Sequence, residues 1–279
     1  MSKILGIVAE YNPFHDGHLF HLNQSKKITN CDFTICVMSG NFIQRGESAI
    51  LDKWARTKMA LNNGIDLVVE LPVIYAISSA ENFSYGAVKI LDSLNVDYIS
   101  FGSESGEIAP LEEIAEILNN EPEQYLQLLN KELDKGISYP KARENAINLY
   151  CRGGCPQPPG HLWADAPMYL SHPNNILGIE YLKALKKLNS KIIPMTIKRS
   201  FEYRSATELR AMMNENDCPK TFEKEIFYVL KKMDVSEIGN LPDVTEGLEF
   251  KIKKALLSSL TLQELISNIK SKRYTRDQD

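Results

Sequence analysis

The sequence predicts an α/β protein built on a doubly wound parallel sheet. Between residues 3 and 101, apolar runs of strand length alternate with longer segments of helical character. These runs are apolar at nearly every position, as expected for strands that helices cover on both faces. The run at 4–9 also passes through a proline-containing turn into a helix that begins near Gly17. Strands alternating with helices in this way indicate parallel strands joined by helical crossovers.

The elements follow from hydrophobic periodicity and from turn residues. We expect strands at 3–9, 32–38, 66–71, 96–101 and 191–197, and helices at 17–27, 53–61, 80–94 and 173–188. Cys31 and Cys36 lie in or beside the second strand and are expected to be small core residues. Parallel strands place their carboxyl ends at one edge of the sheet, so the residues that follow the strands should meet there.

The remaining chain has a different character. Residues 107–149 are polar and helical, residues 151–168 are rich in Gly and Pro and predict a loop, and the segments 222–233, 244–257 and 262–272 are amphipathic. We therefore expect an α/β domain formed by 1–106 and 171–215, a helical insert with a loop at 107–170, and a helical C-terminal region at 216–279.

Composition narrows the class of protein. The 279 residues are 43% hydrophobic, which suffices for a sizeable core, and carry a formal net charge of −4. Any RNA contact must therefore come from a local basic patch. Five cysteines and the lack of a signal peptide predict a reducing, cytoplasmic environment. No apolar run approaches the roughly eighteen residues of a membrane-spanning helix, so no membrane association is expected.

The segment His15-Asp16-Gly17-His18 is the strongest candidate for chemistry. It lies where the first strand passes into the first helix, and a helix N-terminus offers free N–H groups to a phosphate. Gly17 allows close approach of the backbone, and two imidazoles can donate to phosphate oxygens and stabilise charge that develops during in-line attack. The alternative is that the histidines only cap an ordinary helix.

Other strand ends supply further candidates. Gly102 suits a position where a nucleoside lies against bare backbone, or alternatively a plain turn. Arg45 and Lys53 are candidate ligands for a small anion, and Arg56 is either a ligand or a solvated helix charge. A zinc site formed by the cysteines and histidines between 151 and 172 matches no common spacing, so no metal centre is expected.

Several motifs together resemble a known family. The H-x-G-H segment at 15–18 resembles the signature of the nucleotidylyltransferase superfamily, which implies its Rossmann-like fold. Segments 37–47, 53–56, 66–72, 101–104 and 173–181 narrow the resemblance to the tRNA(Met) cytidine acetate ligase family. The match is dense over 1–106 and 171–199. The segment at 205–210 also resembles the second phosphate-binding signature of the superfamily. Ser205 with Glu208 alone would be a capping box, but together with the upstream histidines the segment favours phosphate binding.

The resemblance implies an ATP site in which His15 and His18 are catalytic and Mg²⁺ neutralises the pyrophosphate. The implied ATP-binding residues are Ile7, Val8, Ala9, Glu10, Tyr11, Asn12, Pro13, Phe14, His15, Asp16, Gly17, His18, Leu19, Phe20, Gly102, Asn174, Asn175, Arg199, Ser205 and Arg210.

The resemblance also implies acetate and elongator methionine tRNA as the other substrates. Arg45 and Lys53 are the candidates for the acetate-binding cation, and the basic residues Lys272, Arg273 and Arg276 are the candidates for tRNA contact, with a solvated helix end as the alternative. In the family, similar residues are followed by more chain, so a shortened tRNA-binding end is one interpretation. The sequence gives no oligomeric state.

Two other functions remain open. One is a nucleotidylyltransferase that acts on a small phosphorylated acceptor. The other is a nucleotide-binding module without turnover, because residues 151–170 depart from the family pattern and only five residues separate Arg199 from Ser205.

Overall fold

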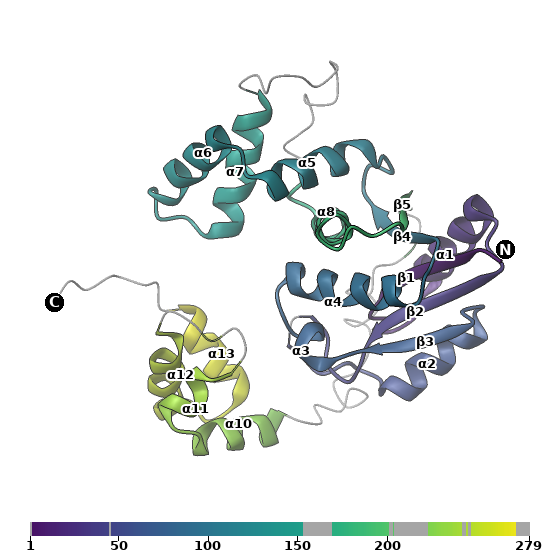
Figure 1. Cartoon of the computed structure of the whole chain (residues 1–279). Helices are drawn as coiled ribbons and strands as arrows, with labels where there is room; N and C mark the ends of the chain where they lie inside the picture. Colours follow the sequence, from purple (N-terminus) through teal and green to yellow (C-terminus); the bar gives the residue numbers. More distant parts are fainter. Residues whose placement is uncertain are drawn as a thin grey trace. The chain divides into compact units, whose positions relative to one another are not determined.

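Five parallel strands form one sheet in the order β3-β2-β1-β4-β5 (Figure 1). The strands are β1 (Ile4–Ala9), β2 (Phe33–Ser39), β3 (Leu67–Leu71), β4 (Tyr98–Ser103) and β5 (Ile193–Lys198). Each predicted strand is confirmed, with bounds that differ by one or two residues. Successive strands are added to one side of β1 through β2 and β3, and then to its other side through β4 and β5. This switch point is where open α/β sheets bind ligands.

The computed structural model describes residues 2–44, 46–152, 169–200, 203, 223–241, 244 and 247–271. The chain divides into two compact units, Met1–Met213 and Asn214–Asp279. Within the described residues of the first unit the helices are α1 (Asp16–Thr29), α2 (Lys53–Asn62), α3 (Val73–Ala76), α4 (Ala80–Ser93), α5 (Ala109–Asn120), α6 (Glu123–Leu133), α7 (Tyr139–Arg152) and α8 (Pro173–Lys187). The four-residue α3 was not predicted, because a segment so short shows no periodicity.

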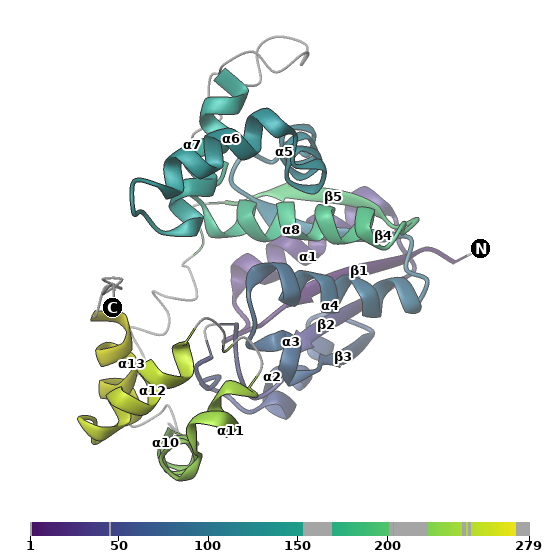
Figure 2. The same ribbon diagram turned by 60° about the vertical axis from the view of Figure 1, so that its left-hand side comes forward.

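Helices cover both faces of the sheet, as the apolar strands predict (Figure 2). Alternate residues of one strand point to opposite faces. In β2, Cys36 and Met38 pack with residues of α1 and α2, whereas Ile35 and Val37 pack with those of α4 and α8. The prediction that Cys36 is a core residue is confirmed.

Three aspartates fix the register of neighbouring strands. Asp32, Asp66 and Asp97 lie just before β2, β3 and β4. Their carboxylates accept hydrogen bonds from the backbone N–H groups of Lys3 at 2.7 Å, Thr34 at 2.8 Å and Ile4 at 2.7 Å, respectively. Because the strands begin in register at this edge, their carboxyl ends also lie together at the opposite edge.

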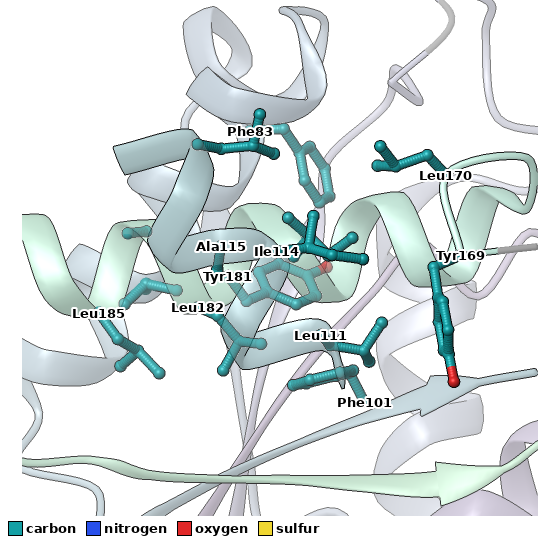
Figure 3. Close-up of a cluster of buried hydrophobic side chains, with 14 of the residues drawn as sticks. Phe83, Phe101, Leu111, Ile114, Ala115, Tyr169, Leu170, Tyr181, Leu182 and Leu185 are labelled. Carbon is teal, nitrogen blue, oxygen red and sulfur yellow. The ribbon is translucent and has the colours of Figure 1, made fainter. Parts of the chain in front are cut away.

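Helices α5, α6 and α7 confirm the predicted helical character of 107–149. Leu111, Ile114 and Ala115 of α5 share a buried cluster with Phe101 of β4 and Leu182 of α8 (Figure 3). The sheet and these helices therefore share one hydrophobic core in the first unit.

The second unit contains α10 (Glu223–Lys232), α11 (Val235–Gly239), α12 (Leu248–Leu257) and α13 (Leu262–Ser271). Residues from all four helices, among them Phe227, Ile238, Leu256 and Leu265, form a separate small core. The predicted amphipathic helices are thereby confirmed over the described residues. No helix in these described ranges has the length and apolar character needed to span a membrane.

Arg56 of α2 joins the ends of β1 and β2. Its side chain is fully buried, and its guanidinium donates to the carbonyls of Glu10 at 2.6 Å, Ser39 at 3.1 Å and Gly40, while Nε donates to Leu51 at 3.0 Å. Burial lowers the pKa of Arg56, and neighbouring carboxylates oppose that shift. The expectation of a solvated helix charge is wrong, because the sequence pattern does not reveal these backbone acceptors.

Replacing Arg56 should destabilise the first unit strongly. Arg56→Met removes the donors of four buried carbonyls, and we expect a loss on the order of 4 kcal/mol in the free energy of unfolding. Urea denaturation followed by circular dichroism measures it. Lys58→Met, at an exposed position on the same helix, is the matched control and should change stability little. Equal stability of the two variants would contradict this structural role of Arg56.

Candidate functional site

A cavity of about 450 Å³ opens at the carboxyl edge of the sheet, where β1, β4 and β5 end. The predicted ATP-binding residues that line it are Ile7, Val8, Ala9, Glu10, Tyr11, Asn12, His15, Gly17, His18, Phe20, Gly102, Asn174 and Arg199. The turn after β1 and the first turn of α1 therefore form much of the wall. The size suits a nucleotide-sized ligand.

Other predicted residues lie elsewhere. Pro13, Phe14, Asp16, Leu19 and Asn175 belong to the same segments but do not line the cavity. Arg45, Ser205, Arg210, Lys272, Arg273 and Arg276 lie outside the described residues.

His15 and His18 form a reciprocal capping box at the start of α1. Nδ1 of His15 accepts a hydrogen bond from the backbone N–H of Gly17 at 3.1 Å, and Nδ1 of His18 accepts one from the N–H of His15 at 3.3 Å. A neutral imidazole that accepts at Nδ1 carries its proton on Nε2. Capping and phosphate donation, which the sequence presents as alternatives, thus use different nitrogens of the same rings.

The surroundings keep these rings packed and His18 neutral. The two rings stack with centroids 3.7 Å apart and an interplanar angle of 26°. Burial lowers the pKa of His18 well below its usual value, and the neighbouring His15 and His21 lower it further. His18 is therefore a neutral N–H donor near pH 7.

Gly17 is required by this close arrangement. A Cβ at Gly17 would lie 2.9 Å from Cε1 of His15, closer than side-chain atoms tolerate. The glycine of the H-x-G-H motif thus makes room for the first histidine. Gly102 differs, because it lies within β4 and a Cβ there would meet no atom within 4 Å. Its interpretation as a turn residue is wrong, and its bare backbone forms part of the cavity wall.

His21, which the sequence analysis did not select, also lines the cavity. Ser25 Oγ donates to the carbonyl of His21 at 2.7 Å, so it accepts from Ser100 Oγ, also at 2.7 Å. Ser100 in turn accepts from Nε2 of His21 at 3.1 Å. This closed ring joins α1 to β4, and burial lowers the pKa of His21 to about 4.

The loop between β2 and α2 is attached to the turn after β1. The amide oxygen of Asn12 accepts from the N–H of Ile50 at 2.8 Å, and the carboxylate of Glu10 accepts from the N–H of Gln44 at 2.7 Å. Lys53, at the start of α2, pairs with Glu70 at 2.6 Å and does not line the cavity. Among the described lining residues the lysine and arginine side chains are those of Lys198 and Arg199.

Helix α8 contributes Asn174 from its first turn. His172 is the N-cap residue and makes no side-chain cap hydrogen bond. Neither asparagine caps this helix, because both side-chain amides contact Glu104 after β4.

Sequence reasoning did not select several further lining residues, although some of them lie in the segments that resemble the family. They include Phe83, Phe101, Tyr181, Lys198, Ser200 and Tyr203. Lys198 is the one that a closer reading of the sequence would have selected, since it ends the last strand beside Arg199.

The described residues contain no group of three or more His, Cys, Asp or Glu side chains that could hold a metal ion. Cys155 and His161 of the zinc hypothesis lie outside the described residues. Glu10 is the one carboxylate among the described residues of the cavity wall. A single carboxylate fits a divalent cation that arrives with the phosphates of the substrate, since Mg²⁺ needs only one or two protein carboxylates in such sites.

Comparisons with known proteins identify the family to which this chain is similar. The model of the HIGH Nucleotidyl Transferase family matches residues 2–217 and 201–278. The tRNA(Met) cytidine acetate ligase of Acetivibrio thermocellus is 46% identical over 98% of this chain and 74% of its own, and that of Clostridium novyi is 42% identical over 98% and 75%. The crystal structure of Thermotoga maritima TmcAL bound with alpha-thio ATP superposes with a TM-score of 0.84 at 33% identity, covering 98% of this chain and 72% of that one.

The buried histidines predict how stability depends on pH. His21 has a pKa of about 4 in the folded chain and about 6.5 when unfolded, so the unfolded state binds more protons between these values. The free energy of unfolding should therefore fall as the pH drops from about 6.5 towards 4. His21→Gln keeps an N–H donor but does not titrate, and its stability should fall less over this range. Urea midpoints of wild type and His21→Gln at several pH values measure the difference. The same pH dependence of the midpoint in both proteins would refute the prediction.

Proposed function

Because the chain belongs to the tRNA(Met) cytidine acetate ligase family of HIGH nucleotidyl transferases, we propose that it activates acetate with ATP and acetylates the wobble cytidine of elongator methionine tRNA. ATP is the activating substrate, and the product is N4-acetylcytidine. The observation that carries the proposal is the capping box of His15 and His18, two residues of the cavity wall, because it uses Nδ1 of both rings and so places their protons on Nε2.

The first step is adenylation of acetate. A carboxylate oxygen of acetate attacks the α-phosphorus of ATP, the bond to the bridging oxygen breaks, and pyrophosphate leaves with the electron pair. Negative charge builds up on the α-phosphate oxygens during the attack. Neutral donors already held in place stabilise that charge, and they cost no reorganisation at the moment of reaction. His15 and His18 have this role.

Other lining residues bind and orient the nucleotide. The bare strand backbone at Gly102 receives the nucleoside, and Arg199 contacts the departing pyrophosphate together with Ser205 and Arg210. Glu10 is the carboxylate of the cavity wall that would hold a Mg²⁺ ion brought by ATP, and the ion would neutralise charge on the polyphosphate. Of the two candidate cations for acetate, Arg45 is the one to test first, because Lys53 is paired with Glu70.

The second step transfers the acetyl group. The N4 amine of the cytidine attacks the carbonyl carbon of acetyl-adenylate, AMP leaves, and the amine loses a proton. The C-terminal region at 216–279 binds the tRNA in this proposal, with Lys272, Arg273 and Arg276 contacting phosphates. The cytoplasmic location stays a prediction.

Pyrophosphate release from ATP tests the first step, and mass spectrometry of methionine tRNA for acetylcytidine tests the second. We expect release that depends on acetate, and acetylated tRNA. Release without acetylated tRNA would contradict the transfer step. Absence of both would contradict the proposed function.

Replacing both histidines by alanine should reduce acetate-dependent pyrophosphate release by about a thousandfold or more, because loss of one oxyanion donor typically costs a hundred- to a thousandfold. His15→Asn separates chemistry from capping, since asparagine is a good N-cap but lacks the distant N–H donor. We expect near-normal stability and low activity from it. His172→Ala, which removes a histidine outside the cavity wall, is the control and should stay within a few-fold of wild type. Wild-type turnover of the double variant would overturn the assignment.

A further inference from the structure

The end of β4 is connected to the start of α8 through Glu104. The backbone N–H of Glu104 donates to the amide oxygen of Asn175 at 3.1 Å, and Nδ2 of Asn174 donates to Oε1 of Glu104 at 2.9 Å. Asn175 is buried, whereas Asn174 lines the cavity. One acidic residue thus holds two consecutive asparagines in different ways, through its backbone and through its side chain.

Glu104 is itself held by a closed turn. Ser103 Oγ accepts from the N–H of Gly106 at 3.0 Å and is hydrogen-bonded to Thr196 Oγ1 of β5 at 2.8 Å. Ser103 is fully buried. The position of the Glu104 carboxylate is therefore set by two neighbouring strands and not by a free loop.

The carboxylate decides which end of the Asn174 amide faces it. An ionised carboxylate only accepts hydrogen bonds, whereas an asparagine amide has an NH₂ donor at one end and an oxygen acceptor at the other. Only the NH₂ end can face Glu104 favourably. The Asn174 side chain is thereby left with its oxygen as the group available to a ligand in the cavity.

An acceptor at this place selects for a donor on the ligand. The phosphates and ring nitrogens of ATP are acceptors, whereas its ribose hydroxyls and its 6-amino group are donors. Gly102, two residues before Glu104, leaves open space beside the strand that a sugar can occupy without meeting a side chain. A ribose hydroxyl is thus the donor that fits this part of the wall.

The Glu104 carboxylate also carries a cost in stability. Its second oxygen, Oε2, is buried and has no hydrogen-bond partner among the described residues. An unsatisfied buried carboxylate oxygen carries a cost in stability. A neutral glutamine would hold the Asn174 amide at a smaller cost, but it would not hold that amide in one orientation, because two amides can pair either way round.

We propose that Glu104 is a positioning residue that gives the cavity its preference for a ribonucleotide, by fixing the Asn174 amide with its oxygen towards a ribose hydroxyl. The inference extends the proposed function, but it concerns nucleotide recognition alone. It can therefore be tested by binding, without acetate or tRNA.

The test compares the dissociation constants of ATP, 2′-deoxyATP and 3′-deoxyATP by calorimetry on the full chain. Wild type should bind ATP about tenfold more tightly than one of the two deoxy analogues, which corresponds to one hydrogen bond. Glu104→Gln should reduce that preference to about twofold, and Asn174→Ala should abolish it. Glu107→Gln makes the same chemical change at an exposed position three residues further on, and should keep the wild-type preference.

Two outcomes would overturn the inference. One is a wild-type preference that Glu104→Gln leaves unchanged, since this variant keeps the contacts of a merely structural residue. The other is that wild type binds ATP, 2′-deoxyATP and 3′-deoxyATP equally well. If it then discriminates only against a triphosphate that lacks the 6-amino group, the amide oxygen meets that group and not a ribose hydroxyl.

In pyrophosphate release, Glu104→Gln should raise the KM for ATP several-fold with kcat nearly unchanged. If wild type shows no release but the binding preference is present, the proposed function fails and this inference stands.

Discussion

The buried guanidinium of Arg56 is the interaction on which the site depends most. It donates to carbonyls at the ends of β1 and β2 and in the loop before α2, and so adds to the sheet pairing and to the loop contacts of Glu10 and Asn12. A buried charge is tolerated only when its donors are used, and here the acceptors are backbone groups at the sheet edge where the histidine turn begins. The turn after β1 is thus held in place by a residue that takes no part in binding.

Beside this support, the H-x-G-H motif has a structural role that leaves room for the chemical role we propose for the same side chains. Each imidazole has two nitrogens, and the backbone N–H groups of α1 occupy Nδ1 of both rings. The cap therefore selects the tautomer that donates from Nε2, and burial keeps His18 neutral. A charged pair would repel, whereas two neutral donors can stack at 3.7 Å. Glu104 combines two roles in a similar way in our proposal, because its carboxylate holds the Asn174 amide at the wall of the cavity.

Much of the fold and the main site were predictable from the sequence, because both depend on local patterns. The strands and longer helices follow from apolar runs, and the cavity follows from the rule that parallel strands end at one edge. The errors concern long polar side chains. In the sequence, Arg56 and Lys53 cannot be told apart from cations that bind a ligand. In the structure, Arg56 donates to carbonyls up to 46 residues away, and Lys53 pairs with Glu70. Glu104 was not selected at all, since nothing near it in the sequence indicates its contact with α8.

The sequence by itself determined the family, the order of strands and helices, and the two histidines at the carboxyl end of β1. Periodicity and short motifs encode these features within a few turns of chain. The tertiary structure alone decided which cations of the described residues line the cavity, which tautomer the histidines adopt, and which end of the Asn174 amide meets Glu104. Those properties depend on hydrogen-bond partners that are distant in sequence, and a partner's identity becomes visible only when the strands and helices are packed together.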